Sequence, residues 1–137
     1  PVGLEGARLA SAGDDGVRVW SWAASSSSWR AEAVDVPADS QVVARDVAWK
    51  AWDGICEMLA SAALQVVIIW LFEASEDGSG SWRASQRITI GEEVWKLSWA
   101  DMGNVCLLSC GEKDQHTVLM KQQLCGEWDV MDVVESN

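Results

Sequence analysis

The sequence has no tyrosine, one phenylalanine, one histidine and two prolines among its 137 residues. Basic residues are also scarce, because ten Lys and Arg face 21 Asp and Glu and leave a net charge of −11. Binding to a phosphate backbone or to anionic lipid requires a surplus of Lys and Arg. Direct binding to nucleic acid or to an anionic membrane surface is therefore not expected.

Signals of catalysis are absent too. A hydrolase triad needs a base beside a nucleophile, and His116 is the only histidine. The sequence holds no GxGxxG, P-loop or HExxH motif. We therefore predict no enzyme activity, no catalytic residue and no cofactor, and we interpret His116 as a surface hairpin residue.

The four cysteines, at positions 56, 106, 110 and 125, are too few and too scattered for a disulfide-stapled secreted module. Cys106, Cys110, His116 and Cys125 loosely match a zinc knuckle. If residues 105–110 form a strand, however, Cys106 and Cys110 lie about 13 Å apart, too far to share one ion. We predict no metal site, reduced thiols and small core cysteines instead.

One long apolar run could be mistaken for a membrane span. It extends over residues 58–72 and is interrupted by Gln65. A membrane helix needs about 20 residues, so this run is too short. We predict no transmembrane segment, and the repeats described next account for the run better.

What the sequence does have is ten tryptophans that fall within internal repeats. Residues 9–20, LASAGDDGVRVW, return as residues 59–70, LASAALQVVIIW, and a diverged third copy lies at 107–120. A second element, RDVAW at 45–49, returns as WKLSW at 95–99. A third element is SWRA at 28–31, SWRA at 81–84 and EWDV at 127–130. Three elements recurring in one order indicate a repeat architecture.

The repeated elements have the composition of strands, because β-branched runs of four to eight residues lie between turn residues. We predict strands near residues 8–13, 16–22, 29–34, 43–49, 58–63, 66–72, 82–88, 94–99, 105–110, 117–121 and 127–133. Four strands per unit at this spacing are typical of β-propeller blades. The expected organisation is a partial blade at 1–34, a complete blade at 43–88, a complete last blade at 94–133 and a tail at 134–137.

These residues resemble a WD-repeat β-propeller, in which residues 9–20 match the second and third strands of a blade. The ordered set 45–49, 94–99 and 126–130 is more specific. It resembles the last two blades of the small WD-repeat subunit family shared by the COPII outer coat and the Y-shaped complex of the nuclear pore. The match covers about residues 8–133 and implies an all-β fold that is the C-terminal portion of an open six-bladed ring.

The sequence departs from the family pattern in three places. The Gly-His dipeptide that opens many repeats is missing, Leu64 and Gln65 replace the Asp-Gly turn of the second unit, and Met120 replaces the expected Trp. The His-Asp-Ser-Trp hydrogen-bond chain of the family is therefore not expected to form completely.

The resemblance implies a non-enzymatic scaffold subunit, located at the cytoplasmic face of the endoplasmic reticulum and at the nuclear envelope. It implies a large helical-solenoid partner and other assembly subunits, with membranes reached only through partners. Two alternatives stay open: a WD-repeat adaptor or substrate receptor that binds peptides on the propeller face, and the related small propeller of the nuclear pore.

Two sets of residues are singled out as structurally or functionally important. Four tryptophans at strand ends are expected in the core: Trp20, Trp49, Trp70 and Trp99. In the resembled family a partner inserts a blade beside the last blade. The residues expected to face that partner are Trp95, Leu97, Leu107 and Val118.

Overall fold

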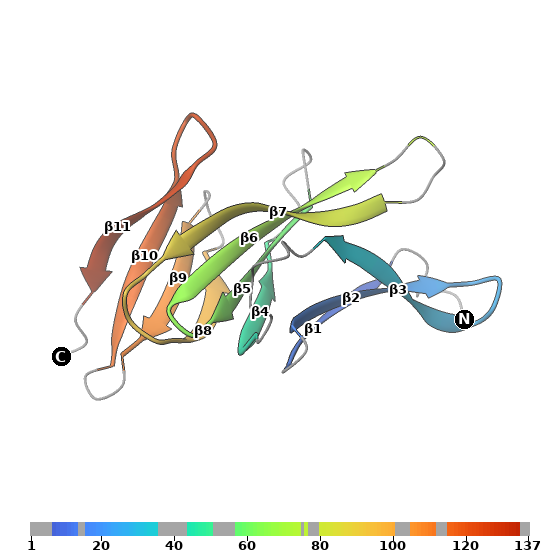
Figure 1. Ribbon diagram of the computed structural model, residues 1–137, viewed down its shortest axis with the longest axis horizontal. Helices are drawn as coiled ribbons and strands as arrows, with labels where there is room; N and C mark the ends of the chain where they lie inside the picture. Colours follow the sequence, from blue (N-terminus) through green and yellow to red (C-terminus); the bar gives the residue numbers. More distant parts are fainter. Residues whose placement is uncertain are drawn as a thin grey trace.

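The computed structural model describes residues 7–13, 16–35, 44–50, 57–74, 76, 80–100, 105–111 and 115–134. These residues form eleven β-strands and no helix (Figure 1). The strands are β1 (Arg8–Gly13), β2 (Gly16–Ala23), β3 (Ser28–Asp35), β4 (Asp46–Trp49), β5 (Met58–Ala63), β6 (Val66–Ala74), β7 (Gly80–Thr89), β8 (Val94–Trp99), β9 (Val105–Cys110), β10 (His116–Gln122) and β11 (Trp128–Val134). No described segment is a helix long and apolar enough to cross a bilayer.

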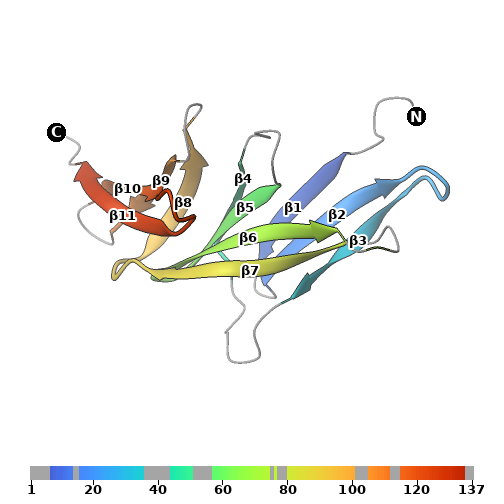
Figure 2. The same ribbon diagram turned by 90° about the horizontal axis from the view of Figure 1, so that it is seen from above.

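The strands form three antiparallel units in chain order, which Figure 2 shows one after another. We call them the first unit (β1–β3), the middle unit (β4–β7) and the last unit (β8–β11). Consecutive strands within a unit pair with each other, as in a meander. All eleven predicted strands are present. β4 begins at Asp46 rather than at residue 43, which lies outside the described residues.

The first and middle units share one feature that the repeats do not predict. Residues 33–35 of β3 pair in parallel with residues 81–83 of β7, so that β1 to β7 form a single seven-stranded sheet. Both strands are the fourth of their units and run in the same direction (Figure 1). Because β3 extends beyond its pairing with β2, its free edge can bond to the start of β7.

The core lies between the units rather than within any one of them. One cluster joins the first and middle units and contains Val17, Val19, Leu59, Trp70 and Trp82. A larger cluster joins the middle and last units. Alternate residues of β5 serve the two clusters, since Leu59 belongs to the first and Met58 and Ala60 to the second. This is why residues 58–72 are almost wholly apolar: the middle unit is covered on both faces.

Candidate interaction surfaces

Each packed interface contains a pair of tryptophans. Trp49 of β4 and Trp82 of β7 lie with ring centroids 5.2 Å apart and planes at 70°. Trp99 of β8 and Trp128 of β11 lie 5.3 Å apart at 77°. Edge-to-face packing of this kind stabilises beyond the burial of area alone. The same two-ring arrangement therefore recurs on the face that each unit turns to the unit before it.

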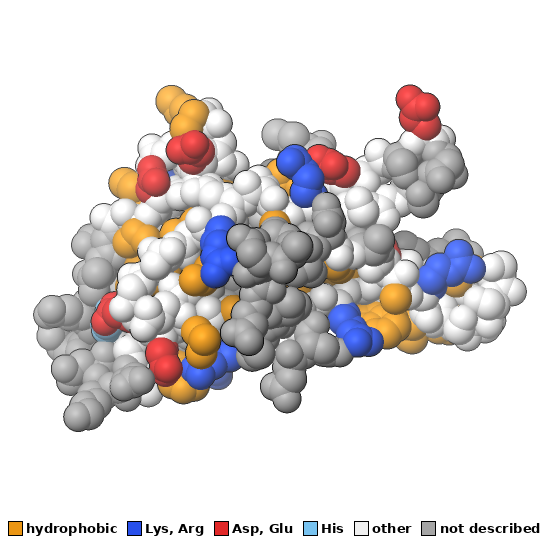
Figure 3. Space-filling model, in the orientation of Figure 1, with side chains coloured by type: hydrophobic (Ala, Val, Ile, Leu, Met, Phe, Trp, Pro, Cys, Tyr) orange, Lys and Arg blue, Asp and Glu red, His pale blue; other side chains and the backbone are white. Residues whose placement is uncertain are grey.

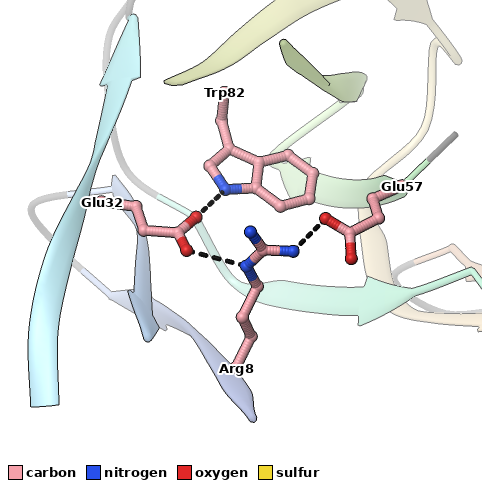
Figure 4. A network of polar contacts seen from close by, with 4 residues as sticks. All are labelled: Arg8, Glu32, Glu57 and Trp82. Atoms are coloured by element: carbon pink, nitrogen blue, oxygen red, sulfur yellow. Dashed lines mark hydrogen bonds and ion pairs between the residues drawn. The ribbon is translucent and has the colours of Figure 1, made fainter. Parts of the chain in front are cut away.

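The outer-strand tryptophan of the middle unit is fixed by a carboxylate of the first unit (Figure 4). Trp82 is fully buried, and its Nε1–H donates to Glu32 Oε2 at 2.6 Å. The second carboxylate oxygen of Glu32 accepts from Arg8 Nε at 2.7 Å, and Arg8 also pairs with Glu57. The Arg8 guanidinium lies 4.5 Å from the centre of the Phe72 ring. A hydrogen-bonded ion network thus joins β1, β3, β7 and the residue before β5.

The equivalent tryptophan of the last unit is held differently. Trp128 is 2% exposed, and its main chain is bonded on both sides by the amide of Gln86. Gln86 Nε2 donates to Trp128 O at 2.8 Å, and Trp128 N donates to Gln86 Oε1 at 2.7 Å. The indole Nε1–H of Trp128 is buried and finds no acceptor among the described residues.

Glu32 and Gln86 occupy the same register position in their units. Glu32 pairs with Val19 and Gln86 pairs with Ile69, and these partners are equivalent in the repeated segments 9–20 and 59–70. A β-bulge between Ile69 and Trp70 adds one residue to β7, so direct alignment of the two SWRA elements places Ser85 there instead.

The inner strands are joined by hydrogen bonds as well. Leu97 N donates to Asp46 Oδ2 at 2.8 Å, and Trp99 Nε1 donates to the carbonyl of Ala48 at 3.0 Å. Between the first and middle units, Ala44 N donates to the carbonyl of Gly13 at 2.9 Å. Each bond satisfies a polar group at a largely apolar interface, where an unpaired group is costly.

The four predicted core tryptophans differ in burial. Trp70 is 3% exposed, and its Nε1–H donates to Ser61 Oγ at 2.8 Å, which is the Ser-Trp portion of the family's hydrogen-bond chain. Trp49 and Trp99 are half-buried beside the clusters. Trp20 is also half-buried, but it pairs with Leu9, which is 51% exposed and outside both clusters. The most buried indoles are those of Trp82 and Trp128, which the third repeated element signalled.

Three of the four predicted partner-facing residues point toward the middle unit. Leu97 and Val118 are 7% and 2% exposed within the cluster shared with that unit. Trp95 is 43% exposed, but Arg45 of the neighbouring segment lies 4.4 Å from its ring centre. Leu107 alone lies on the other face, since Cys106 and Leu108 beside it are buried. This placement corrects the expected orientation of Leu97 and Val118, and partner binding itself stays a prediction.

The face of the last unit that carries Leu107 is called here the free face. Leu107 pairs with Leu119 across β9 and β10, and both are half-buried. Val105 lies two residues away on the same side of β9 and is half-buried as well. Ser109, Lys96 and Lys121 at its margins are exposed. This face is therefore a small apolar centre with a polar rim.

Cys106 and Cys110 are core residues, as predicted, and the three described cysteines are free. Burial raises the pKa of the Cys106 thiol to about 12. Burial, with the Glu92 carboxylate, raises the pKa of Cys110 to about 11. Cys125 differs, because it is exposed in the turn after β10, and Cys56 lies outside the described residues. No group of three or more His, Cys, Asp or Glu within the described ranges is arranged to bind a metal.

His116 is the first residue of β10 rather than a turn residue. Its Nε2 lies 2.6 Å from Glu92 Oε2, and its side chain is 15% exposed. This contact links β10 to the turn before β8. The geometry is that of an ion pair at the end of a sheet and includes no adjacent nucleophile among the printed contacts.

Comparison with known proteins identifies the repeat. The protein transport protein SEC13 of Yarrowia lipolytica is 33% identical over 125 residues, which are 89% of this chain and 39% of that protein. The SEC13 of Schizosaccharomyces pombe is 31% identical over 132 residues, 90% of this chain and 40% of that protein. The chain is homologous to the SEC13 proteins. It spans about two fifths of the length of these relatives.

The fold comparison agrees with the SEC13 assignment. A chain in a crystal structure of the mitotic checkpoint complex superposes with a TM-score of 0.63 at 19% identity, over 95% of this chain and 36% of that one. At that identity the likeness bears on fold alone. No family model matches the chain. The fold is thus all-β and corresponds to part of a WD-repeat propeller of the SEC13 type, as the repeats predicted.

Proposed function

We propose that this chain is part of a non-enzymatic scaffold subunit of a membrane-coat or pore assembly, a COPII vesicle outer coat or the Y-shaped complex of the nuclear pore. The observation that carries the proposal is the likeness to the protein transport protein SEC13 along 89% of the chain. The subunit is proposed to reach membranes through other assembly subunits, at the cytoplasmic face of the endoplasmic reticulum and at the nuclear envelope.

The proposed partner is an elongated helical-solenoid protein that completes the propeller with a blade of its own. The free face of the last unit supports this proposal. Its apolar centre, Val105, Leu107 and Leu119, has the character of the face that the last unit already buries against the middle unit. A sheet laid against it removes apolar surface from water, which is the main favourable term in association.

A charge on the free face tests this mode of binding. Leu107→Asp in the intact protein places a carboxylate at the centre of the proposed contact, where it is desolvated without a partner. We expect loss of the stoichiometric complex with a single large partner. Thr89→Asp, at the exposed end of β7, is the matched control and should retain the complex.

Folding must be verified by circular dichroism before the result is read. Folded Leu107→Asp protein that co-purifies with its partner at the wild-type yield would refute the free-face proposal. Weak peptide binding with no large partner would instead favour the adaptor alternative.

A further inference from the structure

The groove between β7 and the β10–β11 hairpin has a feature that neither the scaffold role nor the free face explains. It lies between the middle and last units and has a volume of about 460 Å³. Its apolar floor comes from Met58, Ile69 and Leu71, and its walls come from Ser85, Gln86, Gln122, Cys125, Gly126, Glu127 and Trp128. We call it the Trp128 groove.

The groove contains a buried hydrogen-bond donor without an acceptor among the described residues. That donor is Trp128 Nε1. The indoles of Trp70, Trp82, Trp95 and Trp99 all donate to a protein oxygen. An unpaired buried N–H costs about 1–3 kcal/mol, so an acceptor brought into the groove is favoured.

The nearest amide does not supply that acceptor. Both polar atoms of Gln86 are bonded to the main chain of Trp128, whereas its counterpart Glu32 bonds the indole of Trp82. Water is a poor substitute over this floor, because a buried water needs two to four polar partners. The volume is also many times the roughly 30 Å³ that one water occupies in the liquid.

The surroundings define the chemistry of the ligand. Glu127 lies on the rim, and the chain has a net charge of −11, so a carboxylate ligand is disfavoured. Leu124, beside Cys125 in the turn, is fully exposed. Along β11, Val130 and Met131 are 44% and 54% exposed. Figure 3 shows hydrophobic side chains next to acidic ones at the upper left, where Figure 1 places this hairpin.

From these observations we infer that the Trp128 groove binds an extended peptide segment of a partner protein, with an apolar side chain on the Met58–Ile69–Leu71 floor and a main-chain carbonyl accepting from Trp128 Nε1. The site is separate from the free face, because Trp128 belongs to the cluster buried against the middle unit. The peptide supplies the acceptor that Glu32 supplies to Trp82 at the other interface.

The experiment uses N-acetyl-leucine methylamide as the probe, since it carries one peptide carbonyl pair and one apolar side chain. The intact protein is labelled with ¹⁵N-tryptophan, and the indole signal of Trp128 is assigned by its disappearance in Trp128→Phe. We expect a saturable downfield shift of that signal on titration, with the signals of Trp70 and Trp82 unmoved. N-acetyl-leucine, which carries a carboxylate, should bind more weakly at pH 7.

Two controls make the result specific to the groove. In a Cys56→Ser background, N-ethylmaleimide on Cys125 should abolish the shift, because Cys125 lines the groove and is exposed. Leu107→Asp should leave the shift intact, which separates this site from the proposed scaffold interface. If Trp128→Phe fails to fold, the Cys125 modification identifies the responding signal instead.

The inference is overturned if the Trp128 indole does not respond to the probe, or if its signal shows contact with bound water that the probe never displaces. It is also overturned if modified Cys125 protein binds the probe as well as unmodified protein.

Discussion

The two interfaces between units use the same pair of rings and secure it with different chemistry. Between the first and middle units, Glu32 bonds the Trp82 indole and an arginine, and a short parallel strand pairing is added. Between the middle and last units, Gln86 bonds the main chain of Trp128, and the rest of the contact is apolar and includes two cysteines. Carboxylate and amide at one register position therefore lead to an ionic interface and a neutral one.

The comparison shows how a repeat can keep its geometry while its local energetics diverge. The ring pairs differ by only 0.1 Å in centroid distance, as 5.2 Å and 5.3 Å. The indole is satisfied in the first case and left without a described acceptor in the second. Position in the blade is thus fixed by packing, and the polar residue beside it is free to acquire a separate role.

The largest effect is expected at the outer-strand tryptophans. Trp82→Ala removes a fully buried indole and should lower the free energy of unfolding by about 3–5 kcal/mol. Trp20→Ala should cost clearly less, since that ring is only half-buried on the face away from the middle unit. Chemical denaturation of both intact variants measures the difference. Equal costs at the two positions would contradict the placement of the core between units.

A smaller effect separates the ionic interface from the neutral one. Glu32→Ala leaves Arg8 and the Trp82 indole without their acceptor and should cost about 2–3 kcal/mol, because hydrogen bonds to charged groups are the stronger kind. Gln86→Ala removes two neutral bonds and should cost about 1 kcal/mol. The measurement is denaturation at low and high salt. A Gln86→Ala variant that loses as much as Glu32→Ala, with the same salt dependence, would remove the distinction.

Much of this fold follows from the sequence, and the parts that do not have physical reasons. Repeated segments such as 9–20 and 59–70 locate the strands because alternation and turn chemistry are local. The faces of the last unit are harder to predict, since a bulge between Val94 and Lys96 shifts the register of β8. A one-residue shift exchanges the two faces of a strand, which is why Leu97 lies inside and Trp95 outside.

The candidate sites were less predictable than the fold for the same reason. The equivalence of Glu32 and Gln86 depends on the bulge in β7, which no alignment of the SWRA elements reveals. The acceptorless Trp128 indole depends on which way one amide points, and that is a property of the packed interface.

Alkaline pH should weaken the neutral interface through its two buried thiols. Their pKa values are about 12 for Cys106 and about 11 for Cys110, against 9.0 for an unperturbed thiol. Above pH 9 the unfolded chain releases these protons while the folded chain retains them. Stability is therefore complete below pH 9 and falls as pH rises toward 11, by up to about 1.4 kcal/mol per pH unit for each thiol.

The thiol contribution is isolated by the double variant Cys106→Ala and Cys110→Ala. Although the variant is less stable at pH 7, its stability should fall less steeply between pH 9 and 10.5. The absence of tyrosine removes one competing titration from this range. Identical slopes for the variant and the parent would show that the thiols titrate alike in both states.

The smallest effect is expected at a turn where the second unit departs from the first. Leu64 and Gln65 connect β5 to β6, and Leu64 has a φ of 54°, a region that favours glycine. Its side chain is 50% exposed, so shortening it forfeits little burial, and its carbonyl still accepts from Val94 N at 2.8 Å. Leu64→Gly should therefore stabilise the protein by about 0.5–1 kcal/mol. Leu64→Val is the matched control and should destabilise it, because a β-branched residue tolerates positive φ poorly. Thermal unfolding of the two variants gives the ordering Gly above Leu above Val, and the reverse order would mean that the Leu64 side chain, rather than its backbone, supports the contact with the last unit.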